Sequence, residues 1–488
     1  DSLSVTGNTV GNPKWNNLWF ENHSEFEYLM YLDLADGLKK VSVNNNVLSG
    51  VKYSATASDT RVYGIRATRG TAIDNLWMEN NTVSNIDLLG TGDKQFTGLF
   101  TGNGNSHLIG NEIKNIEVKS SKSGDQFWGI YVNEGNSTHE IRSNKIHDIN
   151  LTQNQNADNN AIGIFFVGTA SSFNISGNII SKINLGVSDS SALFRGILVT
   201  SCKTANINNN VILHNPGTQV SSQQAYGIYD FAKTGDIFIY HNTVDIKLDF
   251  ASASRGRTAC YYKNNDATRK ISNNIFANQS PEVGGPHYAI YFATSSGAIG
   301  SDFNLLSVAA NPNELVHFGI AYDILGWQKK GFGIKSIAPP SQNFVDQTTG
   351  VQLTSLGNDI GLTNLGIATD LAGNARPMDA GYDLGAYEIA TASLASGITG
   401  LNDDIFAKNT GFDLFPNPAS NMIHINLNNQ NSTSVEFYVY NASGQLVLEH
   451  FSSQEFDSID LSGLQAGFYI IHLVTENGLV EEKRFTKI

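Results

Sequence analysis

The chain has 488 residues and a formal net charge of −14, from 31 Lys and Arg against 45 Asp and Glu. This acidic balance argues against a nucleic-acid binder, which needs a basic face to displace counterions from phosphates, and against charge-driven docking on an anionic membrane. The 55 Asn and 46 Gly are turn residues and poor helix formers, so the composition excludes a helical bundle. Two cysteines are too few for a disulfide framework, and no apolar run reaches the roughly 18 residues of a membrane span.

A short element recurs through the first three hundred residues. It consists of an aliphatic residue, two further residues, Asn, one residue, and an aliphatic or aromatic residue, as in Val5–Val10 and Val43–Leu48. The ten copies are 30 to 38 residues apart, which indicates a repeat architecture. The recurring Asn residues are Asn8, Asn46, Asn81, Asn111, Asn144, Asn178, Asn210, Asn242, Asn274 and, in a looser copy, Asn304.

A second element, with Gly before an aliphatic residue, lies upstream of most of these Asn residues. It reads Tyr63-Gly64-Ile65-Arg66 in one copy, and the last two copies lack the Gly. Each repeat therefore holds short strands of alternating apolar residues between Asn or Gly corners, and it lacks the 3.6-residue period of helical repeats. We expect an all-β fold, with a parallel β-helix of about ten coils over residues 1–310, in which the Asn side chains form a hydrogen-bonded ladder.

The pattern resembles the right-handed parallel β-helix repeats of extracellular polysaccharide lyases, glycoside hydrolases and surface adhesins. This resemblance covers about residues 1–310 and specifies the fold more strongly than the activity. No signal peptide is visible, and the first Asn corner is already at residue 8. We therefore expect the chain to begin within a coil, so that a signal or N-terminal coils are missing.

The strand that carries the Gly element predicts a glycan-binding groove. If Ile65 and its equivalents point inward, the next residue points outward. This outward set forms an aromatic stripe that contains Phe100, Tyr131, Phe165, Tyr229, Tyr262 and Tyr291. The outward set one step back is mostly Gly, so the stripe would border a shallow groove in which rings stack on sugars. Alternatively, the loops bury the stripe, or an error of one residue would place the aromatic residues in the core.

The strongest catalytic candidates are Asp230 and Lys263, which occupy the same strand position on adjacent coils, with Arg195 on a nearby loop. A lyase needs a base close to a neutralised substrate carboxylate, and a hydrolase needs two or three clustered carboxylates. A structural Asp–Lys pair is the alternative interpretation.

Four aspartates precede the Gly element by four or five residues, namely Asp59, Asp93, Asp125 and Asp158. Carboxylates stacked on successive coils repel each other unless a cation such as calcium bridges them. Solvated loop aspartates are the alternative, and no other cofactor is predicted.

The repeat ends near residue 310. We interpret residues 311–388 as a cap that covers the last coil and protects its strand edges. Its end, residues 370–388, resembles the closing segment of secreted β-helix proteins that carry varied C-terminal anchors. Residues 389–411 are small and polar, which is typical of a linker.

Residues 412–488 show short alternating strands and are predicted to form a small antiparallel β-sandwich. They resemble the type A C-terminal sorting domain of type IX secretion substrates in Bacteroidetes. The motifs that carry this resemblance are Phe415–Ala419, Tyr440–Gln445, Leu464–Tyr469 and Lys483–Phe485. The signal residues that it implies are Pro416, Asn417, Pro418, Gly444, Gly467, Tyr469 and Lys483.

This resemblance implies the type IX machinery as a partner, and a protein that is secreted or held on the outer cell surface. A generic carbohydrate-binding sandwich is the alternative for this segment. For the whole chain, the first hypothesis is an adhesin-like module that binds extracellular polysaccharide. The alternatives are a polysaccharide lyase or glycoside hydrolase, and a structural spacer.

Overall fold

The protein is described from a computed structural model. The described residues are 2–11, 18–21, 25–34, 38–55, 59–69, 75–102, 104–120, 124–133, 135–151, 159–186, 192–217, 219–220, 223–250, 256–281, 285–295, 299–339, 346, 348–351, 355–390, 412–427, 435–441, 445–452, 456–475 and 478–488.

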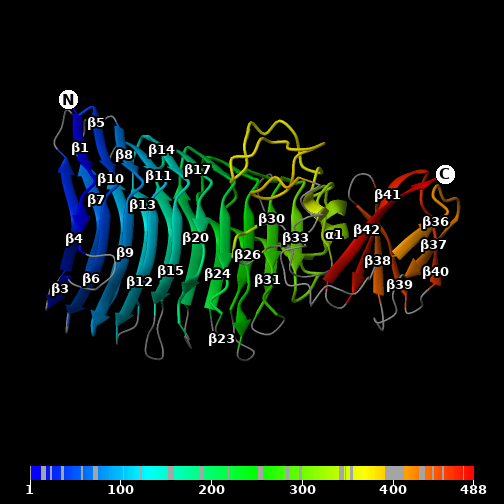
Figure 1. The fold of residues 1–488 in the computed structure, drawn as a ribbon, viewed down its shortest axis with the longest axis horizontal. Helices are drawn as coiled ribbons and strands as arrows, with labels where there is room; N and C mark the ends of the chain where they lie inside the picture. Colours follow the sequence, from blue (N-terminus) through cyan, green and yellow to red (C-terminus); the bar gives the residue numbers. More distant parts are fainter. Residues whose placement is uncertain are drawn as a thin grey trace.

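Three long parallel sheets form a β-solenoid, which confirms the predicted all-β fold (Figure 1). Sheet 1, in order, contains β1 (Ser2–Thr6), β5 (Lys40–Asn44), β8 (Asn75–Glu79), β11 (Asn105–Ile109), β14 (Thr138–Arg142), β17 (Ser172–Ser176), β21 (Thr204–Asn208), β25 (Asp236–Tyr240), β29 (Arg269–Ser272) and β32 (Ile299–Asp302). Each strand pairs with the equivalent strand of the neighbouring coil, so one register runs along the whole axis.

Sheet 2 begins directly after each Asn corner. It contains β2 (Thr9–Val10), β6 (Val47–Ala55), β9 (Thr82–Gly90), β12 (Glu112–Ser120), β15 (Lys145–Leu151), β18 (Ile179–Ile180), β22 (Val211–His214), β26 (Thr243–Ile246), β30 (Ile275–Asn278) and β33 (Leu305–Val308), with β3 (Leu18–Glu21) and β19 (Ile183–Asn184) at its side. A small separate pair is formed by β23 (Gln219–Val220) and β27 (Asp249–Phe250).

Sheet 3 carries the Gly element. Its strands are β4 (Glu25–Leu34), β7 (Thr60–Arg69), β10 (Lys94–Gly102), β13 (Gln126–Asn133), β16 (Asn160–Val167), β20 (Ala192–Ser201), β24 (Gln223–Asp230), β28 (Thr258–Lys263), β31 (His287–Phe292), β34 (Val316–Phe318) and the antiparallel β35 (Ile320–Tyr322).

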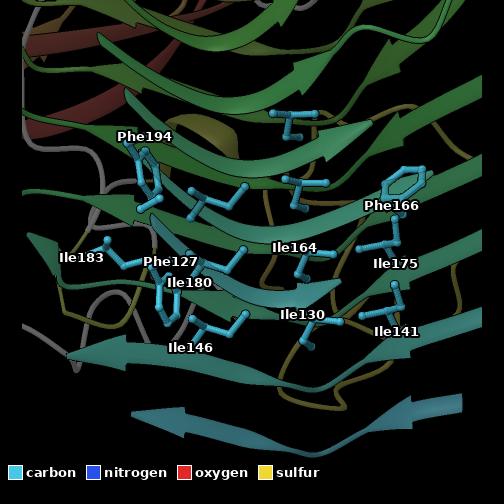
Figure 2. Packing of buried hydrophobic residues seen from close by; sticks show 14 of the residues in the cluster. Phe127, Ile130, Ile141, Ile146, Ile164, Phe166, Ile175, Ile180, Ile183 and Phe194 are labelled. Carbon is cyan, nitrogen blue, oxygen red and sulfur yellow. The ribbon is translucent and has the colours of Figure 1, made fainter. Parts of the chain in front are cut away.

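The core is made of aliphatic columns, one from each sheet. Ile130 of sheet 3, Ile141 of sheet 1 and Ile146 of sheet 2 point toward one another and have no exposed surface (Figure 2). Because the register is constant, each of these residues also stacks on its equivalent in the next coil. Full burial of one such side chain contributes about 1.5–3 kcal/mol, so the columns supply much of the stability of the solenoid.

The predicted Asn ladder is present and continuous. The Asn81 side-chain amide donates to Asn111 Oδ1 at 2.9 Å and to the Val43 carbonyl at 2.7 Å, while the Asn81 backbone N–H donates to the same Oδ1 at 3.0 Å. The same bonds recur from coil to coil until the Asn304 N–H donates to Ser336 Oγ at 3.0 Å. The predicted members with this geometry are Asn46, Asn81, Asn111, Asn144, Asn178, Asn210, Asn242 and Asn274.

A left-handed residue precedes every ladder Asn, a feature that was not predicted from the sequence. Its φ lies between 53° and 70° in all ten copies. Gly or Asn occupies seven of these positions, because these residues tolerate positive φ best. Ser143, His241 and Phe303 occupy the other three. This conformation turns the chain sharply between sheets 1 and 2 and directs the Asn amide along the axis.

The Gly column of sheet 3 is buried, so the predicted bare Gly track on the surface is wrong. A Cβ on Gly129 would lie 2.5 Å from the Gly163 carbonyl oxygen and 2.7 Å from the Ile146 side chain. The strand register also skips this position, because Thr97 pairs with Trp128 and Leu99 with Ile130. Gly and the following Ile therefore both face the interior, which breaks the strict alternation on which the groove prediction depended.

The segment predicted as a cap divides into two parts. The first contains α1 (Ile324–Lys329) and covers the end of the solenoid: Trp327 is fully buried with its ring 6.0 Å from that of Phe292. The second, residues 355–390 with η1 (Ser355–Gly357), packs against outward-facing side chains of sheet 2. Leu384 of this segment shares a buried cluster with Val211 and Ile275. In Figure 1 this yellow segment runs along the side of the solenoid.

Two small antiparallel sheets follow at the C-terminus. One contains β36 (Phe412–Phe415), β37 (Met422–Leu427) and β40 (Phe456–Asp460); the other contains β39 (Leu446–Ser452), β38 (Val435–Asn441), β41 (Gly467–Thr475) and β42 (Gly478–Lys487). Side chains of both sheets, including Ile425 and Val439, form one buried cluster. Residues 391–411, most of the predicted linker, lie outside the described residues. Among the described helices, none has the length and apolar character that crossing a membrane requires.

The ladder predicts a large effect of Asn178→Ala on stability. The change removes the acceptor of two Asn144 donors and the donors to Asn210 Oδ1 and the Ile141 carbonyl, all of them buried. We expect the free energy of unfolding to fall by about 3 kcal/mol. Urea denaturation of the full chain measures it, with the exposed Asn136→Ala as the matched control. Equal midpoints for the two variants would contradict a stabilising ladder.

A buried histidine predicts acid sensitivity. His214 stacks on Phe194 with ring centroids 3.8 Å apart, and burial lowers its pKa to about 3. In the unfolded chain a histidine has a pKa of about 6.5, so between these values the unfolded state binds more protons. The contribution of neutral His214 is complete above pH 6.5 and is lost as pH falls toward 3.

When the pH falls from 6.5 to 4.5, the free energy of unfolding should decrease less in His214→Gln than in the parent chain. The difference between the two decreases should be up to about 2.7 kcal/mol. Urea midpoints at the two pH values measure this difference, and the partly exposed His107→Gln is the control. The same pH dependence in all three proteins would rule out His214 as a source of acid sensitivity.

Candidate functional site

The outer face of sheet 3 carries two columns of side chains, which we call the aromatic face. Because Gly and Ile both point inward, the residue before Gly and the residue after Ile both point outward. The first column contains Tyr28, Tyr63, Thr97, Trp128, Ile162, Arg195, Tyr226, Ala259 and Tyr288. The second contains Tyr31, Arg66, Phe100, Tyr131, Phe165, Leu198, Tyr229, Tyr262, Tyr291 and His317.

The six residues predicted to bind glycan all lie in the second column, and their rings contact one another along the axis. Tyr131 and Phe165 are nearly parallel, with centroids 4.7 Å apart, and Tyr229 and Tyr262 repeat this geometry at 4.7 Å. Tyr291 continues the second stack at 5.1 Å, while Phe100 tilts onto Tyr131 at 5.1 Å. The spacing follows the distance between neighbouring strands. The predicted stripe therefore exists as two stacks, which are separated at Leu198.

Stacking decides which part of each ring meets solvent. The faces of a ring in the stack are covered by its neighbours, so the exposed parts are ring edges and phenol hydroxyls. Tyr262 is 7% exposed, while Tyr131, Phe165, Tyr229 and Tyr291 are half-buried. Burial raises the pKa of the Tyr131 and Tyr229 phenols, so the hydroxyls stay protonated and can both donate and accept hydrogen bonds.

Three arginines lie among these rings. The Arg66 guanidinium is 4.9 Å from the Tyr63 centroid and donates to the Tyr28 hydroxyl at 2.9 Å. The Arg195 guanidinium lies 5.5 Å from the Tyr229 centroid, and that of Arg257 4.5 Å from the Tyr291 centroid. These distances are those of cation–π contacts. Arg195 was predicted as a catalytic group, and the structure places it on the aromatic face.

The other two catalytic candidates lie inside the solenoid. Asp230 and Lys263 do pair in register on adjacent coils, but neither has exposed surface. Asp230 accepts two hydrogen bonds from the buried Arg269, and another from the Tyr261 hydroxyl at 3.0 Å. Lys263 donates to the Asn265 carbonyl at 2.7 Å. The three candidates are not brought together, and the arrangement around Asp230 is that of a buried structural ion pair.

Two described members of the predicted calcium set bond to backbone amides of neighbouring coils, whereas Asp93 Oδ1 is buried and has no hydrogen-bond partner in the described chain. Asp59 Oδ1 accepts from the Asp93 N–H at 3.1 Å, and Asp125 Oδ1 accepts from the Lys94 N–H at 3.0 Å. Asp158 lies outside the described residues. Within the part of the chain that the structure describes, no three His, Cys, Asp or Glu side chains are grouped to hold a metal ion. Calcium binding stays a prediction.

The left-handed corners of three successive coils hold the segment 355–390. Asn209 Nδ2 donates to the Thr369 carbonyl at 2.7 Å, and Asn273 Nδ2 donates to the Leu362 carbonyl at 2.9 Å. His241 Nδ1 lies 3.1 Å from the Asp383 carbonyl oxygen. The occupants of these corners give only part of a sequence signal, because Asn also occupies the corners at Asn45 and Asn80, whereas His occurs among the ten corners only at His241.

The segment 355–390 is itself fixed by buried charges. Arg376 forms an ion pair with Glu388, and its Nη2 donates to Asn209 Oδ1 at 3.0 Å. Beside this contact, residues 365–373 and sheet 1 line an open, polar hollow of about 650 Å³, whose other lining residues include Arg142, Asn174 and Tyr240. This hollow is not among the sites predicted from the sequence.

The first group of predicted sorting-signal residues contacts β42, the last strand of the chain. Pro416, Asn417 and Pro418 are exposed; Asn417 Nδ2 donates to the Arg484 carbonyl at 2.9 Å, and Asn417 Oδ1 accepts from the Thr486 N–H at 2.9 Å. The first motif is thereby bonded to the last strand of the chain.

The remaining signal residues lie on the same pair of strands or outside the described residues. Tyr469 stacks on Phe485 with centroids 5.5 Å apart, and its hydroxyl donates to the Gln465 carbonyl at 2.6 Å. Gly467 begins β41, and Lys483 pairs in register with Ile471 across β41 and β42. Gly444 lies outside the described residues.

Comparison with known proteins identifies this C-terminal segment. A family model of the secretion system C-terminal sorting domain matches residues 413–487. No curated protein matches the chain significantly. The chain is therefore a parallel β-solenoid protein with a C-terminal type IX sorting domain, which engages the type IX machinery and directs the protein across the outer membrane to the cell surface or the medium.

Proposed function

We propose that the exported solenoid is an adhesin-like module that binds extended extracellular glycans along the aromatic face. The observation that carries this proposal is the pair of outward-facing columns, in which aromatic residues recur from coil to coil along the axis. A linear polymer fits a linear, repeated surface. Ring edges contact the apolar C–H groups of a sugar, and phenol hydroxyls bond to its hydroxyl groups.

The outer face of sheet 2 provides a comparison within the same fold. There Lys114 pairs with Glu112 at 2.6 Å, and His147 lies 3.1 Å from the same glutamate. Outward strand positions of this solenoid therefore accept ordinary charged residues, and aromatic columns are not required by the architecture. Most of the first column is buried, and the rings of the second column stay partly exposed. Aromatic surface that the fold does not need and that still reaches solvent favours a binder over a structural spacer.

A polysaccharide lyase or glycoside hydrolase is the second candidate. Its residues would be Asp230, Lys263 and Arg195, but a substrate cannot reach a carboxylate without exposed surface, and Arg269 already neutralises Asp230. Binding without cleavage is the better-supported proposal. We divide the chain accordingly into a binding solenoid (1–310), its cap (311–388), a linker (389–411) and the sorting domain (412–488).

Glycan binding is tested with Tyr229→Ala. We expect it to lower the affinity for a bound polysaccharide about fivefold to tenfold, because one ring contact and one hydroxyl are lost. Isothermal titration follows a screen of the full chain against neutral and acidic polysaccharides, and the control is Phe238→Ala, a partly exposed ring on sheet 1. Equal losses in both variants, or no bound glycan in the screen, would reject the aromatic face as the binding site. The same incubations should release neither reducing ends nor ultraviolet-absorbing unsaturated products.

The export route is tested by deleting residues 412–488. We expect the truncated protein to accumulate in the periplasm, because the matched domain is the signal that the secretion machinery reads. Cell fractionation with antibody against the solenoid measures its location, and the full chain is the control. Normal display of the truncated protein on the cell surface would falsify this role.

A further inference from the structure

The arginines among the rings of the aromatic face are partly buried, and they differ from the two buried arginines of the described chain. Arg269 and Arg376 each form an ion pair with a buried carboxylate. Arg66, Arg195 and Arg257 instead lie against rings, and among the described residues none of the three forms an ion pair. Their positive charge is therefore not neutralised by a carboxylate of the described chain.

The surroundings of these arginines also contain few negative groups. Along the strands from β7 to β24, the outward positions of sheet 3 hold no Asp or Glu. The groups that act electrostatically on Arg195 are the phenols of Tyr229 and Tyr226. Acidic side chains lie toward the two ends of the face, where Asp33 is exposed on β4 and Glu314 acts on Tyr288. A positive strip thus runs through a chain of net charge −14.

Ring stacking alone does not account for the three arginines. The Nε atom of each is buried and has no hydrogen-bond partner among the described residues. Arg66 donates to the Tyr28 hydroxyl and Arg257 to that of Tyr262, so the protein's own partners of these two side chains are uncharged phenols. Stacking on a ring fixes the plane of a guanidinium and leaves the terminal N–H groups as its donors. A planar fork of this kind binds a carboxylate or a sulfate through two parallel hydrogen bonds.

We infer that the glycan bound by the aromatic face is acidic, and that Arg66, Arg195 and Arg257 bind its carboxylate or sulfate groups. This inference rests on the proposed glycan binding and names its ligand class. Arg66 and Arg195 are four strands apart, and Arg195 and Arg257 are two apart. At about 4.8 Å per strand these separations are about 19 Å and about 10 Å. The ligand therefore carries negative groups repeatedly along its length.

Two pairs of ligands distinguish the effect of ligand charge on binding from the effect of the sugar backbone. One is polygalacturonate with its methyl ester, and the other is dextran sulfate with dextran; in each pair the sugar backbone is the same. For at least one pair we expect the full chain to bind the charged member at least tenfold more tightly at low ionic strength. We expect this preference to shrink as salt rises to 0.5 M, about five times the 0.1 M at which screening already acts over about 10 Å.

Single substitutions test which side chains cause the preference for the charged ligand. Arg195→Gln and Arg66→Gln should each weaken binding of the charged member about threefold to tenfold and leave binding of the uncharged member unchanged. Arg195→Lys keeps the charge without the planar fork and should recover part of the loss. The exposed Lys145→Gln on sheet 2 removes an equal charge elsewhere and should have no effect. The salt and ligand comparisons use the unaltered chain, so they remain decisive if a variant does not fold.

The outcomes are distinguishable from those that test glycan binding itself. Equal, salt-independent binding of charged and uncharged members would overturn this inference while glycan binding stands, as would a Lys145→Gln effect equal to that of Arg195→Gln. Absence of binding to every member of both pairs, and to the wider screen, would overturn the proposed function and this inference together. A charge preference that only the aromatic-face arginines reduce supports both.

Discussion

The buried Asn ladder is the interaction on which the rest of this structure depends. An amide without exposed surface must satisfy its donors and its acceptor internally, and here each amide does so with the coils on either side. That requirement places every corner directly above the previous one. A constant corner sets a constant register, and a constant register stacks inward residues into aliphatic columns and outward residues into the aromatic face. The surface that we propose for binding is thus a consequence of a hydrogen-bonded corner.

The sequence was sufficient for the features that depend on local chemistry and repetition. The Asn corners could be recognised because a side-chain amide that donates and accepts along the axis recurs in every repeat, and the sorting motifs because several of them follow one another in order. The alternation of strand residues correctly directed Ile65 inward and Phe100 outward. It failed at the Gly positions, because a bulge places two successive residues inside, and a period of two has no signal for a bulge.

The remaining errors concern partners that are distant in sequence. The alternation of strand residues that starts from Ile228 already directs Asp230 inward, and only the charge of Asp230 suggested a catalytic site. The ion-pair partner of Asp230, Arg269, is 39 residues away and could not be assigned without the fold. His241 likewise adopts an unfavourable left-handed conformation, and its ring contacts Asp383, which is 142 residues further along the chain. A pattern search finds what repeats, whereas a contact that occurs once needs the three-dimensional structure.

The segment 355–390 has a mechanical consequence. A solenoid is held together by contacts between neighbouring coils, so it can open from its ends one coil at a time. Asn209, His241 and Asn273 bond to one peptide segment and so join three successive coils. One of these coils cannot separate from the solenoid without also breaking the bonds that the other two coils make to this segment. Under a pulling force, such as that on a surface protein that holds a polymer, the coils before Asn209 would yield first. The coils beside this segment would come apart as one cooperative block.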